Sequence, residues 1–264
     1  MGHVVKAGMN MKAVITDLDR TLLHTDKSVS EETVRVLQNC RENGIVVVVA
    51  TARPERAIDR YQKQIGFDAL ITLNGARIVL NSKELNYSIP KNNVLQMLQK
   101  LENIGGVMIS LETEKGIFSN ADIPLWQPIV YRKLSEAPLP DVFYKVLVSS
   151  DKIDLHECID GILTEDTYAS VADGNLFQIM SKQATKWNGI RVMLDTLGIS
   201  PEETVYFGDD NDDLEAIENC GIGVAVSNAI ECVKEAADII VKSNDEDGVA
   251  EFLKGMLMIE DIES

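Results

Sequence analysis

The stretch Ala13-Val14-Ile15-Thr16-Asp17-Leu18-Asp19-Arg20-Thr21-Leu22-Leu23 runs from apolar, β-branched residues into two carboxylates placed two residues apart. Its first half predicts a buried strand, with Asp17 and Asp19 where that strand opens into a loop. Because side chains of an extended segment alternate with a period of two, both carboxylates point to the same side. One is a candidate nucleophile and its neighbour a candidate acid or base, and a divalent cation would relieve their repulsion. On this segment alone, a plain turn that ends a strand fits equally well.

Length and charge limit the classes of function. The chain has 264 residues, which suits one large domain or two smaller ones. Its 25 basic and 42 acidic side chains give a formal net charge of −17. Binding to nucleic acid or to an anionic membrane surface is therefore disfavoured, since both depend on positive charge. A small phosphorylated substrate stays compatible with this charge, because charges beyond a Debye length of roughly 8 Å are screened.

The cysteines and the apolar runs point to an ordinary intracellular protein. Cys40, Cys158, Cys220 and Cys232 are scattered, without the spacing of a zinc site, and predict buried, reduced thiols. No stretch approaches the roughly 20 apolar residues of a membrane span, and the N-terminus lacks the apolar core of a signal peptide. We therefore expect a cytoplasmic protein. Its oligomeric state cannot be inferred from the sequence.

Strand-like and helix-like segments alternate in the first third of the chain. Ser30, followed by two glutamates, predicts the start of a helix that ends at Gly44. Residues 45–50, Ile-Val-Val-Val-Val-Ala, form an unbroken apolar run that is typical of a strand covered on both faces. Pro54 predicts the first position of the next helix, and residues 69–72 a third strand. Such a β-α-β-α-β series indicates a parallel, doubly wound sheet.

The pattern changes in the middle of the chain and then returns. Short strand-like segments surround one helix, and a hairpin is expected to turn at Asp173-Gly174-Asn175. We therefore predict an α/β fold with a doubly wound, mainly parallel, Rossmann-like core sheet and an inserted α+β cap domain. The core is assigned to residues 11–80 and 183–264, and the cap domain, expected as a lid over the mouth of the sheet, to residues 81–182.

Ligands of such sheets bind beyond the carboxyl ends of the strands, so the loops after the strands are the candidate site. Asp17 and Asp19 follow the first strand, Thr51 follows the second, and an acidic run follows a late one. A hydroxyl at the base of a helix, with the backbone N–H groups after it, is a natural seat for phosphate. Thr51 and Ala52 fit this pattern, although a lone Thr at this place more often only ends a strand.

The acidic run Asp209-Asp210-Asn211-Asp212-Asp213 is the second candidate. Four acids within five residues repel one another, either in a solvated loop or, more economically, around a hard cation with oxygen ligands. Mg²⁺ usually takes one or two carboxylates plus water and substrate oxygens, so three of the acids are expected to support rather than touch it. Lys186 adds the opposite charge, although a Lys in the first turn of a helix is usually a surface residue.

These motifs, in this order, resemble the haloacid dehalogenase (HAD) superfamily. The resemblance rests on four elements: Asp-x-Asp-x-Thr at 17–21, Thr51, Lys186, and Gly-Asp-x-x-x-Asp at 208–213. The insert after the third strand and several shorter segments resemble the Cof-type phosphatases: Asn74-Gly75-Ala76, Lys182, Ser227-Asn228-Ala229 and the run 244–248. The resemblance spans nearly the whole chain. It implies a Mg²⁺-dependent phosphatase of small phosphorylated metabolites, with sugar phosphates first, that works through an aspartyl-phosphate intermediate.

The resemblance also implies a role for each residue. Asp17 would attack phosphorus, while Asp19 would protonate the leaving oxygen and then deprotonate water. The phosphate would be held by Thr51, Ala52, Lys186 and Asn228. The cation would be held by Asp17, the backbone carbonyl of Asp19 and Asp209, with Asp212, Asp213 and Asn228 in support.

Three positions depart from the family pattern, and two other functions stay open. Arg20 stands where Gly is common, Ala52 where Gly is usual, and Asp212 where Asn is frequent, but none of these removes a catalytic group. A phosphomutase or phosphotransferase would use the same motifs and pass the phosphoryl group to a sugar hydroxyl. A non-catalytic phospho-ligand sensor would not need both Asp17 and Asp19. We also expect an exposed Arg53 paired with a local Glu, and unpaired histidines.

Overall fold

The computed structural model describes residues 11–172 and 175–257. It divides into a core unit, which runs up to Leu85 and resumes at Thr185, and an inserted unit, Asn86–Ala184. The boundary expected after residue 80 leaves out a strand, Lys83–Asn86, that continues the core sheet in the structure. Two residues of the expected turn, Asp173 and Gly174, lie outside the described residues, as do residues 1–10.

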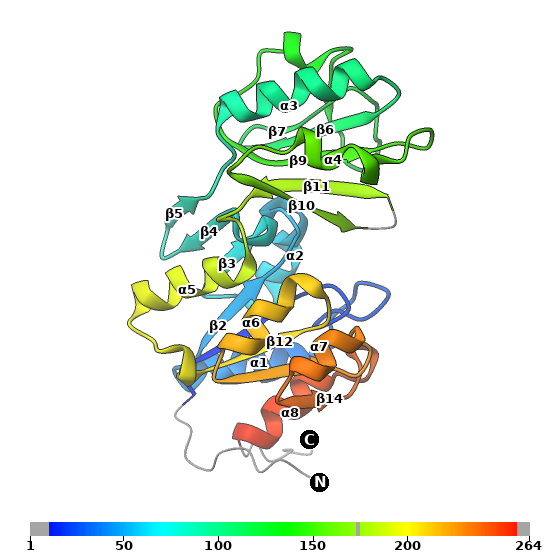
Figure 1. Ribbon diagram of the computed structural model, residues 1–264. Coiled ribbons are helices and arrows are strands. Elements are labelled where there is room, and N and C mark those ends of the chain that lie inside the picture. The colour runs from blue at the N-terminus through cyan, green and yellow to red at the C-terminus, as the bar shows by residue number, and fades with distance from the viewer. Residues whose placement is uncertain (1–10, 173–174, 258–264) are drawn as a thin grey trace. The chain divides into compact units, whose positions relative to one another are not determined.

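The core unit is built on one mainly parallel sheet (Figure 1). Within the described residues it has eight strands in the order β14-β13-β12-β1-β2-β3-β4-β5. All neighbours from β14 to β3 are parallel, and β4 runs antiparallel to β3. The strands are β1 (Ala13–Thr16), β2 (Val46–Ala50), β3 (Ala69–Thr72), β4 (Arg77–Leu80), β5 (Lys83–Asn86), β12 (Thr204–Gly208), β13 (Ile222–Val226) and β14 (Ile239–Val241).

The order of the parallel strands confirms a doubly wound sheet. From β1 the chain moves outward through β2 to β3, and after the inserted unit it moves the other way, from β12 through β13 to β14. The winding therefore reverses between the neighbouring strands β1 and β12, which is where such sheets bind ligands. The apolar run in β2 is covered on both faces, since Val47, Val48 and Val49 are all fully buried.

Helices cover the two faces of this sheet. Helix α1 packs against α2 and α8, while α6 packs against both α5 and α7. Helix α1 begins where the sequence predicts, because the Ser30 side chain accepts the backbone N–H of Thr33. The helices of the core unit are α1 (Glu31–Glu42), α2 (Glu55–Ile65), α5 (Lys186–Leu197), α6 (Leu214–Asn219), α7 (Glu231–Ala236) and α8 (Gly248–Leu257).

The inserted unit is an α+β structure with its own sheet, in the order β10-β11-β9-β6-β7-β8. Its strand pairs are antiparallel except β7 with β8. Helices α3 and α4 share a hydrophobic core with one face of this sheet, through residues such as Leu98, Ile162 and Val148. Its elements are α3 (Lys91–Ile104), β6 (Met108–Thr113), β7 (Gly116–Ser119), β8 (Ile129–Val130), β9 (Phe143–Ser149), α4 (Ile159–Ile162), β10 (Thr167–Ala172) and β11 (Leu176–Ser181).

Two further observations concern the burial of the cysteines and the search for membrane-spanning helices. Cys40 and Cys220 are buried as expected, but Cys158 is half-buried and Cys232, in the short helix α7, is exposed. Across residues 11–172 and 175–257, no helix combines the length and the apolarity required to cross a membrane.

Gly75 couples the turn after β3 to the start of α5. It has a positive φ of 90°, and a Cβ at this position would lie 2.1 Å from the backbone oxygen of Thr185. We expect Gly75→Ala to lower the free energy of unfolding by about 2 kcal/mol or more, because backbone strain and a backbone clash add. Urea denaturation measures this loss.

Gly44→Ala is the matched control. Gly44 also has a positive φ, 79°, but a Cβ there would meet nothing within 4 Å. The control therefore carries only the backbone cost of about 1 kcal/mol. Equal losses for the two variants would contradict the close approach of Gly75 to Thr185.

Candidate active site

The predicted acidic residues meet at the carboxyl ends of β1 and β12. Asp17 directly follows β1, and its backbone N–H donates to the oxygen of Phe207 in β12 at 2.9 Å. Asp209 directly follows β12, so both carboxylates stand at the point where the winding of the sheet reverses. Both side chains are almost fully buried. The parallel pairing of β1 with β12 therefore joins motifs that lie almost two hundred residues apart.

Lys186 lies inside the acidic cluster. It is the first residue of α5, whose N-cap Thr185 accepts the backbone N–H of Asn188 at 3.1 Å. Its Nζ lies 2.9 Å from Oδ1 of Asp17 and 2.6 Å from Oδ1 of Asp213. Burial alone would lower the pKa of Lys186, but the surrounding carboxylates raise it well above its ordinary value. The side chain is therefore a buried, permanently charged ammonium and not a surface lysine.

Asp213 anchors the loop that carries Asp209. Its Oδ1 accepts hydrogen bonds from Lys186 and from the Tyr206 hydroxyl, the latter at 2.5 Å. Its Oδ2 accepts the backbone N–H groups of Asp209 and Asp210 at 2.9 and 3.0 Å. Four donors thus surround one completely buried carboxylate. This arrangement suits a residue that fixes the loop more than one that offers an oxygen to a ligand.

Asp213 also belongs, with Asp17 and Asp209, to a cluster of acids whose oxygens lie close enough to surround a metal ion. Ligand atoms of Asp17, Asp209 and Asp213 all lie within 4.8 Å of one another. Burial raises the pKa of Asp17 well above its ordinary value and that of Asp209 to about 7. Buried carboxylates this close repel one another, and oxygen ligands of this kind suit a hard divalent cation. The donor set therefore fits such an ion.

Asp212 points to the same cluster from a more exposed position. Its Oδ2 lies 3.3 Å from Nζ of Lys186 and accepts a hydrogen bond from Nδ2 of Asn74 at 2.6 Å. Asn74 stands in the turn after β3 with a left-handed φ of 57°, a conformation that Asn tolerates better than most residues. The turn after β3 thus supports the acidic loop after β12.

The Asp19 side chain is held by two cations. Arg53 donates from Nε to Oδ2 and from Nη2 to Oδ1, both at 2.6 Å, and Nζ of Lys27 donates at 2.8 Å. Burial alone would raise the pKa of Asp19, but these hydrogen bonds outweigh burial and lower it. The expectation that Arg53 pairs with a local Glu is wrong, because the turn after β2 brings the guanidinium beside the loop after β1.

Thr51 and Ala52 occupy that turn after β2. The Thr51 backbone donates to the oxygen of Ile71 and accepts from the N–H of Asn74, which fixes it to β3 and its turn. Its buried hydroxyl accepts the N–H of Arg53 at 3.2 Å, and a hydroxyl that accepts one hydrogen bond still has a proton to donate. The hydroxyl can therefore still donate a hydrogen bond to a ligand.

Asn228 ties together two loops of the core unit. Its Nδ2 donates to the backbone oxygen of Arg20 at 2.7 Å, and its Oδ1 accepts the N–H of Asn244 at 3.0 Å. Both polar ends of the side chain are therefore engaged by backbone groups. Because an amide nitrogen carries two hydrogens, Nδ2 can donate to a second acceptor without releasing Arg20.

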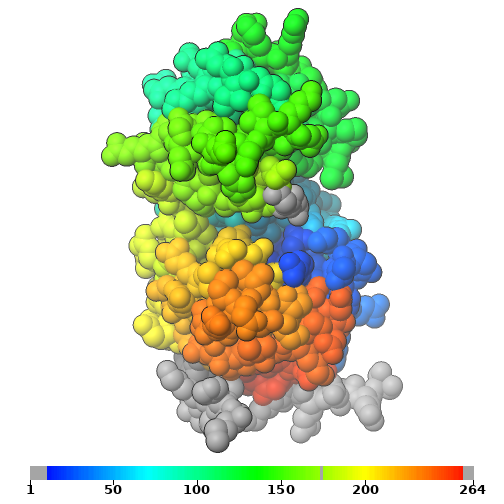
Figure 2. All heavy atoms as spheres, turned by 45° about the vertical axis from the view of Figure 1, so that its right-hand side comes forward, coloured from blue at the N-terminus to red at the C-terminus, as the bar shows by residue number. Residues whose placement is uncertain are grey.

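The same loop after β1 reaches the segment before α8. Nε2 of His24 lies 2.9 Å from Oδ1 of Asp247, and Thr25 donates its N–H and its hydroxyl to Asp245. The space-filling view shows this dark blue loop beside the orange-to-red segment (Figure 2). His24 is thus paired, contrary to the expectation of unpaired histidines, because the fold brings it to a carboxylate more than two hundred residues away.

Several site residues were not identified from the sequence. The Thr21 hydroxyl donates to Oδ1 of Asp209 at 2.7 Å, and its place in the Asp-x-Asp-x-Thr motif is a signal that points to it. Asn74 has a signal in the Asn-Gly turn after a strand. Tyr206 and Lys27 have none, because a Tyr in a buried strand and a Lys in a loop are ordinary residues.

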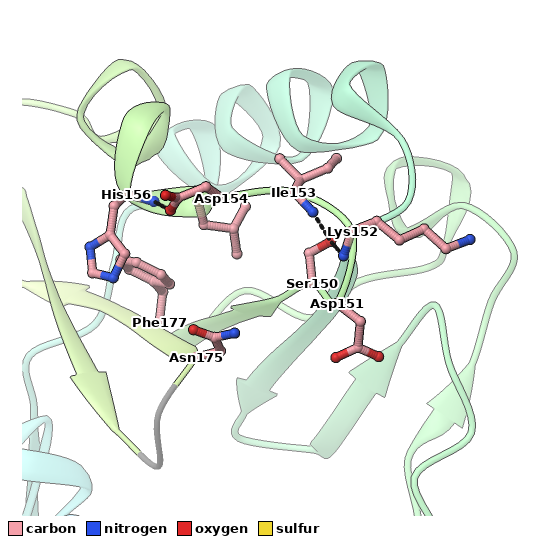
Figure 3. A pocket seen from close by; sticks show the side chains of 9 residues that line it. Ser150, Asp151, Lys152, Ile153, Asp154, His156, Asn175 and Phe177 are labelled. Carbon is pink, nitrogen blue, oxygen red and sulfur yellow. Dashed lines mark hydrogen bonds between the residues drawn. The ribbon is translucent and has the colours of Figure 1, made fainter.

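The inserted unit contains a pocket of about 430 Å³ at the end of β9 (Figure 3). Asp154 accepts the backbone N–H of His156, and the Ser150 hydroxyl accepts the N–H groups of Lys152 and Ile153. These polar groups therefore serve their own loop. None of the predicted catalytic, phosphate-binding or metal-binding residues lines this pocket.

The raised pKa of Asp209 predicts a stability that depends on both pH and metal. The folded protein keeps a proton on Asp209 up to about pH 7, whereas the unfolded chain releases it near 3.8. The folded state therefore binds more protons in this window, and the free energy of unfolding falls as pH rises through it. Thermal melting in EDTA from pH 5 to 8 measures the slope.

Saturating Mg²⁺ should remove most of that slope, and Asp209→Asn should lower it by the share that Asp209 contributes, because the pKa of Asp17 is raised as well. The cation compensates the ionised carboxylate, and the amide has no proton to release. A slope that is the same in all three samples would contradict the assignment to Asp209.

The neighbouring acids Asp212 and Asp213 should respond differently to the same change. Asp213→Asn places an amide opposite four donors and leaves Lys186 with one carboxylate fewer, so we expect a loss of about 3 to 5 kcal/mol in unfolding free energy. Asp212→Asn, at a side chain that is 36% exposed, should cost less than about 1 kcal/mol. Urea unfolding compares them, and equal losses would show that Asp213 is not an anchor.

Comparison with known proteins identifies relatives of this chain over most of its length. A 5-amino-6-(5-phospho-D-ribitylamino)uracil phosphatase of Bacillus subtilis is 28% identical over 273 residues, which cover 91% of this chain and 96% of the relative. A phosphoglycolate phosphatase of Methanopyrus kandleri is 25% identical over 245 residues, which cover 92% and 96% of the two chains.

One solved structure and one protein family also match this chain. The structure of a HAD subclass IIB sugar phosphatase has a TM-score of 0.76 at 25% identity and covers 94% of this chain, which in turn covers all of it. The family of haloacid dehalogenase-like hydrolases matches residues 14–253. This match confirms the resemblance carried by the four motifs, and the chain belongs to the haloacid dehalogenase-like hydrolase family.

Proposed function

We propose that the protein is a Mg²⁺-dependent phosphatase that hydrolyses small phosphorylated metabolites through an aspartyl phosphate on Asp17. Sugar phosphates are the leading candidate substrates. One observation carries the proposal. The buried carboxylate of Asp17 stands at the reversal point of a doubly wound sheet, 2.9 Å from the buried ammonium of Lys186 and beside Asp209. A nucleophile, a fixed cation and a cation-binding acid thus share one place.

The residues that would hold Mg²⁺ are Asp17, Asp209 and the backbone carbonyl of Asp19. Bound there, the ion neutralises charge on the phosphoryl group and keeps the Asp17 carboxylate ionised. Asp213 supports this set by fixing the backbone N–H groups of Asp209 and Asp210. Asp212 supports it through Lys186 and Asn74.

The chain's own residues divide the reaction into two displacements. Asp17 forms a bond to phosphorus as the ester oxygen leaves, and Asp19 gives that oxygen a proton. A water then attacks the same phosphorus, Asp19 takes its proton, and the Asp17 carboxylate is released with inorganic phosphate. Lys186, the Thr51 hydroxyl and the N–H of Ala52 hold the phosphoryl oxygens during both steps.

The surroundings of Asp19 favour its second role. Arg53 and Lys27 hold it as a carboxylate, which is the form that takes a proton from water. To act as the acid in the first step, Asp19 has to be protonated, which requires these hydrogen bonds to loosen when the substrate binds. Arg53 and Lys27 therefore control the timing of proton transfer.

Covalent catalysis and electrostatic stabilisation have to supply most of the rate acceleration. Hydrolysis of phosphate monoesters requires up to ~10²¹-fold acceleration, of which a general acid and base contribute only about 10² to 10⁴. The remainder falls to covalent catalysis at Asp17 and to the positive charge of Lys186 and Mg²⁺ around the transferred group.

The relatives support the substrate class. The two curated relatives are phosphatases named for a phosphorylated ribitylaminouracil and for phosphoglycolate, and the structural neighbour is a sugar phosphatase. The substrates in these names are all small organic phosphates, and two of the three are phosphates of a sugar or a sugar alcohol.

Removal of the nucleophile tests the proposal. With Mg²⁺, the protein should release phosphate from p-nitrophenyl phosphate and from a panel of sugar phosphates, and Asp17→Asn should lower kcat by about 10³-fold or more, because the amide cannot form the phosphoenzyme. Asp26→Asn, a change at a carboxylate in the same loop that is fully exposed, should leave kcat unchanged. Activity of Asp17→Asn equal to that of the control would refute the mechanism.

Product analysis separates hydrolysis from transfer. With an acceptor sugar present, a phosphatase still releases one inorganic phosphate for each substrate consumed. A shortfall of inorganic phosphate matched by a new sugar phosphate would favour a phosphomutase or phosphotransferase.

A further inference from the structure

Arg20 places a second cation beside Asp209. Its Nε lies 3.7 Å from Oδ2 of Asp209, whose other oxygen, Oδ1, accepts the hydroxyl of Thr21. The other end of the guanidinium donates from Nη2 to the backbone oxygen of Asn228 at 3.2 Å. The side chain is 54% exposed, whereas Asp209 is almost completely buried. Arg20 thus reaches inward from the surface to a buried carboxylate.

The backbone holds Arg20 in an uncommon conformation to do this. Its φ is 61°, in the left-handed region that side-chain-bearing residues seldom adopt. The strain is balanced by Asn228, whose Nδ2 donates to the Arg20 oxygen at 2.7 Å while its own backbone oxygen receives the guanidinium. This two-way connection fixes the Arg20 backbone, while the guanidinium itself is held by one hydrogen bond and the longer contact with Asp209.

We propose that Arg20 is a built-in counter-ion of the metal site, which balances the ionised carboxylate of Asp209 when no divalent cation is bound and weakens the binding of that cation. The inference rests on the metal-binding part of the proposed function. A guanidinium stays charged at every working pH, so its opposition to a nearby dication is permanent. The affinity of the site is therefore set lower than its carboxylates alone would make it.

Arg20 differs in this respect from Lys186, the other cation of the cluster. Lys186 contacts Asp17, Asp212 and Asp213 and is 2% exposed, so it is part of the fixed frame of the site. Arg20 contacts Asp209 at a longer distance and borders solvent, so it can withdraw when a cation takes the carboxylate. Arg20 therefore competes with the divalent cation for Asp209, whereas Lys186 keeps its contacts with the other carboxylates.

The size of the effect follows from distance and screening. A monovalent cation close to a divalent one, in surroundings close to water, changes the binding constant on the order of three- to tenfold. The effect should shrink as salt rises, because one of the two charges is exposed.

Calorimetric titration with Mg²⁺, without substrate, tests the proposal on the full-length protein. Arg20→Gln removes the charge and keeps a donor for Asn228, and it should bind Mg²⁺ about three- to tenfold more tightly than the wild type. Arg20→Lys keeps the charge and should bind like the wild type. Arg41→Gln is the matched control for the change in net charge, since Arg41 pairs with the partly exposed Asp68 at 2.9 Å and should leave the affinity unchanged.

A second variant keeps the test decisive if Arg20→Gln does not fold. Arg20→Asn removes the charge with a residue that tolerates left-handed φ, and it should show the same gain in affinity. The rise in Tm on adding Mg²⁺ should likewise be larger in either uncharged variant than in Arg41→Gln.

The possible failures are distinguishable. An affinity of Arg20→Gln and Arg20→Asn equal to or below that of Arg41→Gln would overturn the role of Arg20 and leave the phosphatase proposal intact. Absence of Mg²⁺ binding in the wild type and in every variant would overturn both.

Discussion

The burial of one ammonium group among carboxylates is the constraint on which the rest of the site depends. Lys186 contacts Asp17 and Asp213 from a position without access to solvent. Charges out of water are stable only when each has partners, and removing one partner leaves the other uncompensated. Because Lys186 begins the helix that resumes the core after the inserted unit, this cluster also joins the two halves of the core chain.

The arrangement of these charges is held in place by groups that take no part in the proposed reaction. Asp213 accepts four hydrogen bonds and thereby shapes the loop after β12, while Asn74 and Thr21 each hold one further carboxylate. A site that must present acids at a set distance cannot leave them free to move apart under their own repulsion. The supporting hydrogen bonds oppose that repulsion before any cation or substrate arrives.

The loop after β1 distributes the charges of the site in two directions. Asp19 turns toward Arg53 and Lys27, beside β2, while Arg20 turns toward Asp209 and the loop after β13. Under the proposed function, adjacent residues thus serve different tasks, proton transfer on one side and charge balance at the metal ligands on the other. The ties from His24 and Thr25 to the segment before α8 hold the remainder of this loop in place.

The sequence by itself determined the layered core and the identity of the central acids. Apolar runs such as residues 45–50 and caps such as Ser30 are local signals, and their alternation leaves few arrangements other than a doubly wound sheet. Only the tertiary structure decided which partner each side chain takes. Asp19 meets Arg53, Asp209 meets Thr21 and Arg20, and Asn228 meets two backbone groups, because strand order and loop direction bring together residues up to about two hundred positions apart. Local periodicity contains no information about such pairings, since they depend on how β1 and β12 lie side by side.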